Sequence, residues 1–135
     1  MTTPDHSTRY LETQVLTASP GQLLIIAYDI ALRALRQAAE HMTVRNYEGQ
    51  QTEIAKAQMV LDELLTSLDA QANAQLASHL SRLYTYLYQR LSHANVRDDR
   101  RALDEVINVL SDLRAAWAEA DVKARQEAAA GSGLR

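Results

Sequence analysis

The sequence predicts an all-α protein, and three observations carry this prediction. The chain has 135 residues, close to the usual size of about 150 residues for one domain. Ala and Leu together fill 41 positions (22 Ala and 19 Leu), Gly and Pro number only 4 and 2, and Phe is absent. This composition favours helices over strands. Apolar residues also recur every three or four positions in four long segments, which is typical of an antiparallel up-down four-helix bundle.

A short arm is expected before the bundle, over residues 1–18. Only the segment 10–16 of this arm has amphipathic spacing. Ser19 and Pro20 then mark the start of the first long helix, because Ser caps helices well and Pro suits their first position. Gln22 lies at the position where, in a capping box, a side chain accepts a hydrogen bond from the backbone N–H of the capping residue. We expect this helix to end near Met42.

The second and third long helices follow from two leucine-rich stripes. The first stripe covers 54–68 at alternating spacings of three and four. A loop over 69–74 comes next, with Asp69 or Asn73 as the candidate cap of the following helix. The second stripe, over 76–94, predicts the third helix.

A turn over 95–99 precedes the fourth helix, whose apolar stripe covers 103–120. After about Lys123 the chain turns to Ala, Gln and Gly, so the end is expected to fray. The bundle is therefore expected to span 19–125, and the frayed tail to span 126–135.

Charge and composition exclude several classes of function. The formal net charge of −3 argues against a nucleic-acid partner, because such binding relies on neutralising phosphates. Cysteine is absent, so disulfides and thiolate chemistry are excluded, and we expect no metal and no cofactor. No apolar run is long enough for membrane insertion. The first residues show neither the basic nor the apolar part of a secretory signal, so a cytoplasmic location is expected.

One polar pair resembles a catalytic arrangement. His79 is followed three residues later by Arg82, so both lie on one face of the third helix. Histidine phosphotransfer domains are also four-helix bundles, and they expose a His followed by Lys and then Gly at these positions. Here Leu83 takes the place of the Gly and falls on the core stripe. The sequence thus favours a solvated His–Arg pair over phosphotransfer, and no catalytic residue is predicted.

The chain carries more apolar residues than one small core needs. A bundle helix requires about three apolar residues in seven, yet the first long helix is apolar nearly all round over 23–30. The third adds Tyr84, Tyr86 and Tyr88, and tyrosine suits a partly wet groove. Two interpretations stay open: a thick core or self-associating face, and a groove for an amphipathic partner helix. The amphipathic arm could fill such a groove when no partner is bound.

Four blocks, in order and at matching spacing, resemble the flagellin-specific export chaperones (FliS) over about residues 10–120. The blocks contain Tyr10, Val15-Leu16-Thr17-Ala18-Ser19-Pro20, Leu23-Leu24 and Tyr28-Asp29; Lys56-Ala57-Gln58, Leu64 and Ser67-Leu68-Asp69; Leu83-Tyr84, Tyr86, Arg90-Leu91 and Ala94-Asn95; and Leu110, Leu113-Arg114 and Trp117.

The resemblance implies a cytoplasmic bundle that binds the disordered C-terminal segment of flagellin. Such a chaperone prevents premature polymerisation and delivers the subunit to the flagellar export gate. The resemblance also implies that the arm around Tyr10 covers part of the groove and moves when flagellin binds. The export gate is thus an expected second partner, and an anti-sigma factor is left open as a further one.

The candidate site follows from the surplus apolar residues together with the resemblance. Asn95 could hydrogen-bond the bound segment or cap its own helix, and Trp117 is expected in the core because it lies on the fourth stripe. The predicted groove residues are Leu24, Ile25, Tyr28, Tyr84, Tyr88 and Asn95, and those of the arm are Tyr10, Leu11, Val15 and Leu16.

Overall fold

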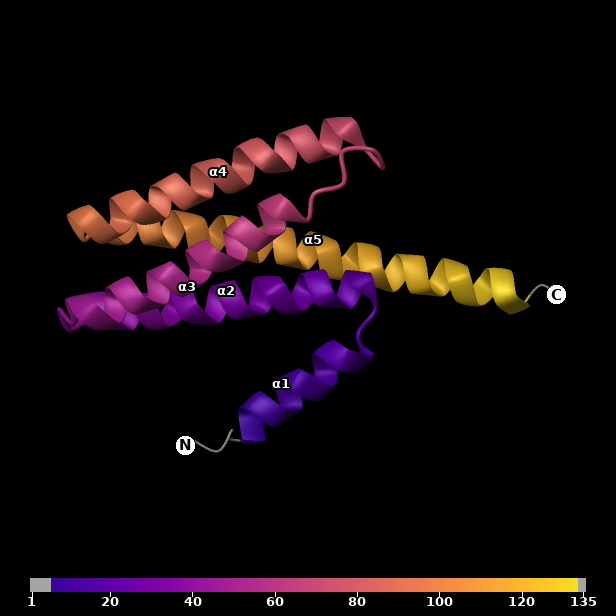
Figure 1. The fold of residues 1–135 in the computed structure, drawn as a ribbon, viewed down its shortest axis with the longest axis horizontal. Helices are drawn as coiled ribbons and strands as arrows, with labels where there is room; N and C mark the ends of the chain where they lie inside the picture. Colours follow the sequence, from indigo (N-terminus) through magenta and orange to yellow (C-terminus); the bar gives the residue numbers. More distant parts are fainter. Residues whose placement is uncertain (1–5, 134–135) are drawn as a thin grey trace.

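Five helices build the protein in the computed structural model, which describes residues 6–133. The last four form a bundle in which α2 and α4 each pack against α3 and α5, while α1 diverges from it (Figure 1). The all-α fold predicted from the sequence is confirmed. The helices are α1 (His6–Thr17), α2 (Pro20–Thr43), α3 (Tyr47–Thr66), α4 (Ala74–Arg97) and α5 (Arg100–Gly133).

Side-chain caps start each helix of the bundle. At α2 the backbone of Gln22 donates to Ser19 Oγ at 3.3 Å, and the backbone of Ser19 donates to Gln22 Oε1 at 3.0 Å, so the predicted capping box is present. Asn46 and Asn73 cap α3 and α4 by accepting from the backbone three residues later. Asp99 accepts from the two backbone N–H groups that open α5. These bonds satisfy donors that have no partner inside the helix.

Three helix boundaries differ from the sequence-based prediction. Residues 95–97 belong to α4, because the chain leaves the helix only at Asp98, whose φ of 51° is left-handed. Residues 126–133 continue α5, where the sequence predicts a frayed tail. Ala, Glu, Gln and Arg are strong helix formers, and extending an existing helix avoids the cost of nucleation. In addition, α3 begins at Tyr47, well before its apolar stripe, because Asn46 caps it there.

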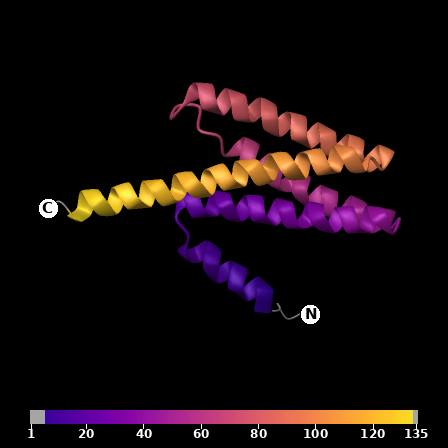
Figure 2. The same ribbon diagram turned by 180° about the vertical axis from the view of Figure 1, so that it is seen from behind.

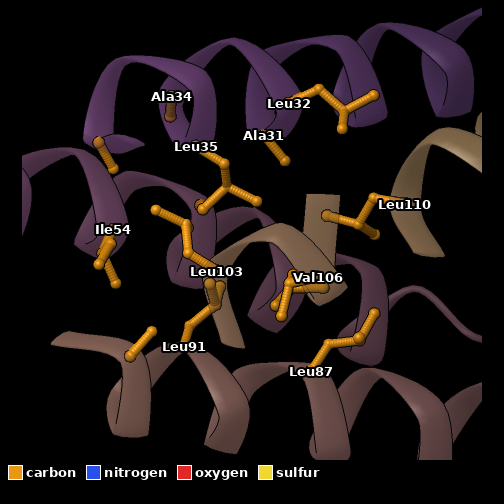
Figure 3. Close-up of a cluster of buried hydrophobic side chains, with 14 of the residues drawn as sticks. Ala31, Leu32, Ala34, Leu35, Ile54, Leu87, Leu91, Leu103, Val106 and Leu110 are labelled. Carbon is orange, nitrogen blue, oxygen red and sulfur yellow. The ribbon is translucent and has the colours of Figure 1, made fainter. Parts of the chain in front are cut away.

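The core is a single cluster filled by the apolar stripes of α2 to α5 (Figure 3). Most members of the cluster are leucine and alanine. The cluster comprises Tyr28, Ala31, Leu32, Ala34, Leu35, Ala38, Ala39, Ile54, Ala57, Leu61, Leu64, Leu80, Tyr84, Leu87, Leu91, Ala94, Ala102, Leu103, Val106 and Leu110.

Polar bonds fasten the end of the bundle that carries the α2–α3 and α4–α5 turns, here called the closed end. Gln50 of α3 is 1% exposed, and its Nε2 donates to Asn95 Oδ1 at 3.1 Å and to Asp98 Oδ1 at 3.0 Å. Arg100 donates to the carbonyl of Ala39 at 3.2 Å and to Thr43 Oγ1 at 3.1 Å. The two turns are thus tied to neighbouring helices.

This network corrects the interpretation of Asn95. Its side chain accepts from Gln50 at the closed end, so it does not cap α4, which ends at Asp98, whereas a hydrogen bond to the bound segment stays a prediction. The alternation of apolar residues carries no information about such a contact between two distant amides.

The opposite end of the bundle, here called the open end, is less tightly buried. It holds the start of α2, the α3–α4 loop and the middle of α5 (Figure 1). The apolar side chains here pack against the core but remain partly exposed; they include Leu24, Leu65, Leu68, Leu113 and Trp117.

Two buried tyrosines meet inside the bundle, between α2 and α4. Tyr28 is 0% and Tyr84 is 1% exposed, and their hydroxyl oxygens lie 2.5 Å apart in a hydrogen bond. The prediction that both line a surface groove is therefore wrong for this structure, because each side chain reaches the core and satisfies its polar end on the other.

The tyrosine pair predicts a loss of stability at alkaline pH. Burial is the main cause that raises the pKa of Tyr28 and of Tyr84 above the ordinary value of 10. Above about pH 10 the unfolded chain releases protons that the folded chain retains, so the free energy of unfolding falls as the pH rises further. Urea unfolding at about pH 8 and pH 11 measures this fall. A Tyr28→Phe/Tyr84→Phe variant should lose less stability over the same interval, and an equal loss would contradict the assignment.

Candidate partner-binding face between helices α2 and α5

The start of α2 and the second half of α5 enclose two neighbouring depressions at the open end. Figure 2 shows α5 running beside α2 and continuing past the residue where α2 begins. The first depression has a volume of about 380 Å³ and is walled by Leu24 of α2 and Trp117 of α5. Three small residues of α5 also line it, namely Ala120, Ala124 and Ala128. This depression is therefore mostly apolar.

The second depression, of about 310 Å³, lies between α1, α2 and α5. Its apolar wall is formed by Ile25 and Ile26, whereas Gln14 and Ala18 border it from the α1 side. It is more polar than the first because charged residues of α2 and α5 line it as well. The arm thus touches the edge of the face that α2 and α5 present.

Two ion pairs set the charge of this face. Asp121 is 9% exposed at its side chain and pairs with Arg125 at 3.2 Å, between the two depressions. A Cβ at Gly21 would collide with the Asp121 carboxylate in its present position, so glycine leaves room for this side chain. Asp29 accepts two hydrogen bonds from Arg114, at 2.8 and 3.2 Å. These bonds raise the pKa of the Arg114 guanidinium. Each charge is offset locally, and the face as a whole stays near neutral.

The arm presents its apolar side chains to solvent. In α1, Leu11 is 36% exposed, Val15 is 41% exposed and Leu16 is 85% exposed. Together with Glu12 these residues line a shallow apolar depression of their own. The side chain of Tyr10 lies outside the described residues. The amphipathic character predicted for the arm is thus present, but its apolar side chains lie largely uncovered.

The structure divides the six predicted groove residues among four places. Leu24 and Ile25 lie on the α2–α5 face, one in each depression. Tyr28 and Tyr84 lie in the core beneath, and Asn95 belongs to the closed end, as described above. Tyr88 is partly buried on α4 against the core, and its backbone carbonyl accepts from Gln58 at 3.1 Å. The structure therefore does not bring the six residues together on one surface.

Sequence reasoning placed Trp117 and Ala120 on the apolar stripe of the fourth helix but missed Ala124 and Ala128 as part of this face. The spacing of Trp117, Ala120, Ala124 and Ala128 continues the core stripe of this helix by steps of three and four. Such small residues read as the start of fraying when no packing partner is evident. Their helical spacing was the signal that could have found them.

Neither a metal centre nor a membrane span is found within residues 6–133. Their His, Asp and Glu side chains form no group of three that could hold a metal ion. None of the helices in this part of the chain combines the length and apolar character needed to cross a bilayer. The fold and the α2–α5 face define the class of the protein as a small helical bundle with an apolar depression on its surface.

Comparisons with known proteins agree with this class. The chain matches the family described as "Flagellar protein FliS" over residues 3–124. It is 32% identical to the flagellar secretion chaperone FliS of Bacillus subtilis, with 94% of each chain covered. It is 34% identical to the protein of the same name from Salmonella typhimurium, with 84% of this chain and 85% of the relative covered. A solved structure titled "Crystal structure of flagellar chaperone from bacteria" matches with a TM-score of 0.73 at 20% identity, over 85% of this chain and 94% of that one, which supports the fold.

The chain belongs to the FliS family of flagellar secretion chaperones. The resemblance found in the sequence is thereby confirmed. The family is one of chaperones and not of enzymes, so phosphotransfer at His79 is no longer a competing interpretation.

Proposed function

We propose that the protein binds the disordered C-terminal segment of flagellin in the cytoplasm and holds it until export. Bound in this way, the segment cannot reach other flagellin copies, and the complex can travel to the flagellar export gate. The observation that carries the proposal is the apolar depression beside Leu24 and Trp117, which stays open at one end of a bundle otherwise well packed. Membership of a family of secretion chaperones supports the same conclusion.

The energetics of the proposed complex follow from burial and ordering. A disordered amphipathic segment gains about 1.5–3 kcal/mol for each aliphatic side chain that it buries fully. Folding the segment on the bundle costs about 2–5 kcal/mol or more. A few anchors on Leu24, Ile25 and Trp117 therefore give binding that is favourable and still reversible, as delivery requires.

Calorimetric titration with a flagellin C-terminal peptide tests the proposal. We expect saturable 1:1 binding with a negative heat-capacity change, because apolar surface is buried. A flagellin N-terminal peptide is the control and should not bind. If the folded protein binds neither peptide, the proposed function is wrong, and self-association becomes the interpretation to examine by mass measurements at several concentrations.

The arm is proposed to compete with flagellin for this face. Gln14 and Ala18 already border the second depression, and the apolar side chains of α1 are available to cover more of it. Deleting the residues before Thr17 should raise the apparent affinity for the C-terminal peptide by about two- to fivefold, because a covered face lowers affinity by the fraction of time it is open. Titration of both chains measures the difference.

A second variant separates competition from any effect of shortening the chain. Val15→Asp keeps the full arm but places a charge on its apolar side, so the arm should cover the α2–α5 face less often. The affinity for the C-terminal peptide should therefore rise, as in the deletion. Weaker binding by either variant, with helix content unchanged, would show that the arm assists binding and does not compete.

A further inference from the structure

Asp121 and Arg125 lie where the two depressions of the α2–α5 face meet, because both side chains line both depressions. The two residues are one helical turn apart on α5, and Arg125 Nε lies 3.2 Å from Asp121 Oδ2. The side chain of Asp121 is 9% exposed, whereas that of Arg125 is 58% exposed. A nearly buried anion thus holds a largely exposed cation at the border between the depressions.

The first turn of α2 constrains the position of Asp121. Its Oδ1 lies against Gly21, where any Cβ would collide with it. This turn is the positive end of the α2 dipole, which favours a nearby carboxylate. Because one oxygen of the carboxylate packs against α2 and the other pairs with Arg125, the carboxylate restrains the direction in which the guanidinium points.

Arg125 keeps hydrogen-bond donors that the protein does not use. A guanidinium carries five N–H groups in a fixed plane. Within residues 6–133, Arg125 pairs only with Asp121 and through Nε, so the N–H groups of its two terminal nitrogens are available. Arg114 also lines the second depression, but it uses two of its nitrogens on Asp29, at 2.8 and 3.2 Å. The two arginines of this face are therefore not equivalent.

An available guanidinium between apolar walls favours a particular type of ligand. Its N–H groups can only donate, and a carboxylate matches their planar arrangement best. A partner that covers the face also removes water from Arg125, which costs free energy if the guanidinium gains no new acceptor. An amphipathic segment with an acidic residue between its apolar anchors avoids this cost and complements the charge of Arg125.

We propose that Arg125 is a specificity-determining residue that binds an acidic side chain of the flagellin C-terminal segment, and that Asp121 positions it. The apolar side chains on either side of this acidic residue enter the two depressions. Arg125 directly follows the residues matched to the family, which end at 124, so this contact adds to what family membership supports. The inference rests on the proposed function for the identity of the bound segment.

Calorimetric titration of Arg125→Gln with the flagellin C-terminal peptide tests the inference. Glutamine is a good helix former, so the change removes the charge and keeps the helix. We expect binding about five- to tenfold weaker than in the wild-type chain at about 0.05 M salt, and a smaller difference at about 0.5 M, because salt screens an exposed ion pair. Arg101→Gln is the matched control, since it changes the net charge equally at an exposed arginine of α5 at the closed end, and it should bind like the wild-type chain.

A peptide series identifies the acidic partner of Arg125. Each Asp or Glu of the peptide is replaced in turn by Asn or Gln. One of these replacements should weaken binding to the wild-type chain but leave binding to Arg125→Gln nearly unchanged, because the two groups interact only when both are present. Additive losses for every replacement would overturn the inference.

Arg125→Lys tests whether the orientation of the guanidinium matters as well as its charge. Lysine keeps the charge but lacks the rigid planar donors, so this variant should recover only part of the lost affinity. Full affinity would contradict the positioning role of Asp121. Equal binding by the wild-type chain and Arg125→Gln would contradict the role of Arg125 alone, whereas a wild-type chain that binds no peptide would overturn the proposed function together with this inference.

Discussion

Leu24→Asp is expected to weaken binding of the flagellin C-terminal segment by about 100-fold or more. Leu24 walls the apolar depression on α2, so the change removes an apolar contact of about 1.5–3 kcal/mol. It also places a carboxylate where the bound segment excludes water, which adds a desolvation cost. Each 1.4 kcal/mol corresponds to a tenfold change in affinity, and calorimetric titration measures the sum.

Leu23→Asp is the matched control for this prediction. Leu23 is the preceding residue in the same helical turn, is 40% exposed and is absent from the wall of the depression. The control should bind within about threefold of the wild-type chain. Because Leu24 also packs against the core, circular dichroism must show that Leu24→Asp stays helical, and Leu24→Ala provides a milder variant with an expected loss of about tenfold. Equal affinities for the two aspartate variants would place the binding face elsewhere.

Leu35→Ala is expected to lower the free energy of unfolding by about 2–5 kcal/mol. Leu35 is 0% exposed and lies among Ile54 and Leu103 in the centre of the core (Figure 3). Replacing a buried leucine with alanine removes its transfer free energy and leaves a cavity that close-packed neighbours fill only in part. Urea unfolding monitored by circular dichroism measures the change.

Leu16→Ala makes the same chemical change in α1, where the leucine is 85% exposed. It should alter the free energy of unfolding by less than about 0.5 kcal/mol. A large loss in this control would mean that the arm packs on the bundle in solution far more closely than the structure shows.

The sequence predicted the fold well because the fold depends on repeated, local signals. Ser19 and Gln22 predicted the capping box, Asn73 was one of two candidate caps, and the leucine spacing predicted the four bundle helices, all of which the structure contains. Boundaries were less predictable where a single backbone conformation decides them. Asp98 ends α4 in a left-handed conformation that no apolar pattern reports.

The candidate site was harder to predict because side-chain partners across the bundle are not visible in a periodic pattern. Tyr28 and Tyr84 belong to different helices and satisfy each other only when the bundle forms, so their polar ends suggested a surface. Asn95 finds Gln50 in the same way. Leu24 and Ile25 lie on the partly exposed α2–α5 face, where α2 carries more apolar residues than its core stripe needs, and their role in binding a partner stays a prediction.

The closed end and the open end of the bundle differ in how firmly their helices are joined. Gln50 and Arg100 join the four helices near one pair of turns, whereas Leu24 and Trp117 at the other end are only partly buried beside an open depression. We therefore expect a bound segment to disturb the helices near Leu24 and Trp117 more than those near Gln50 and Arg100.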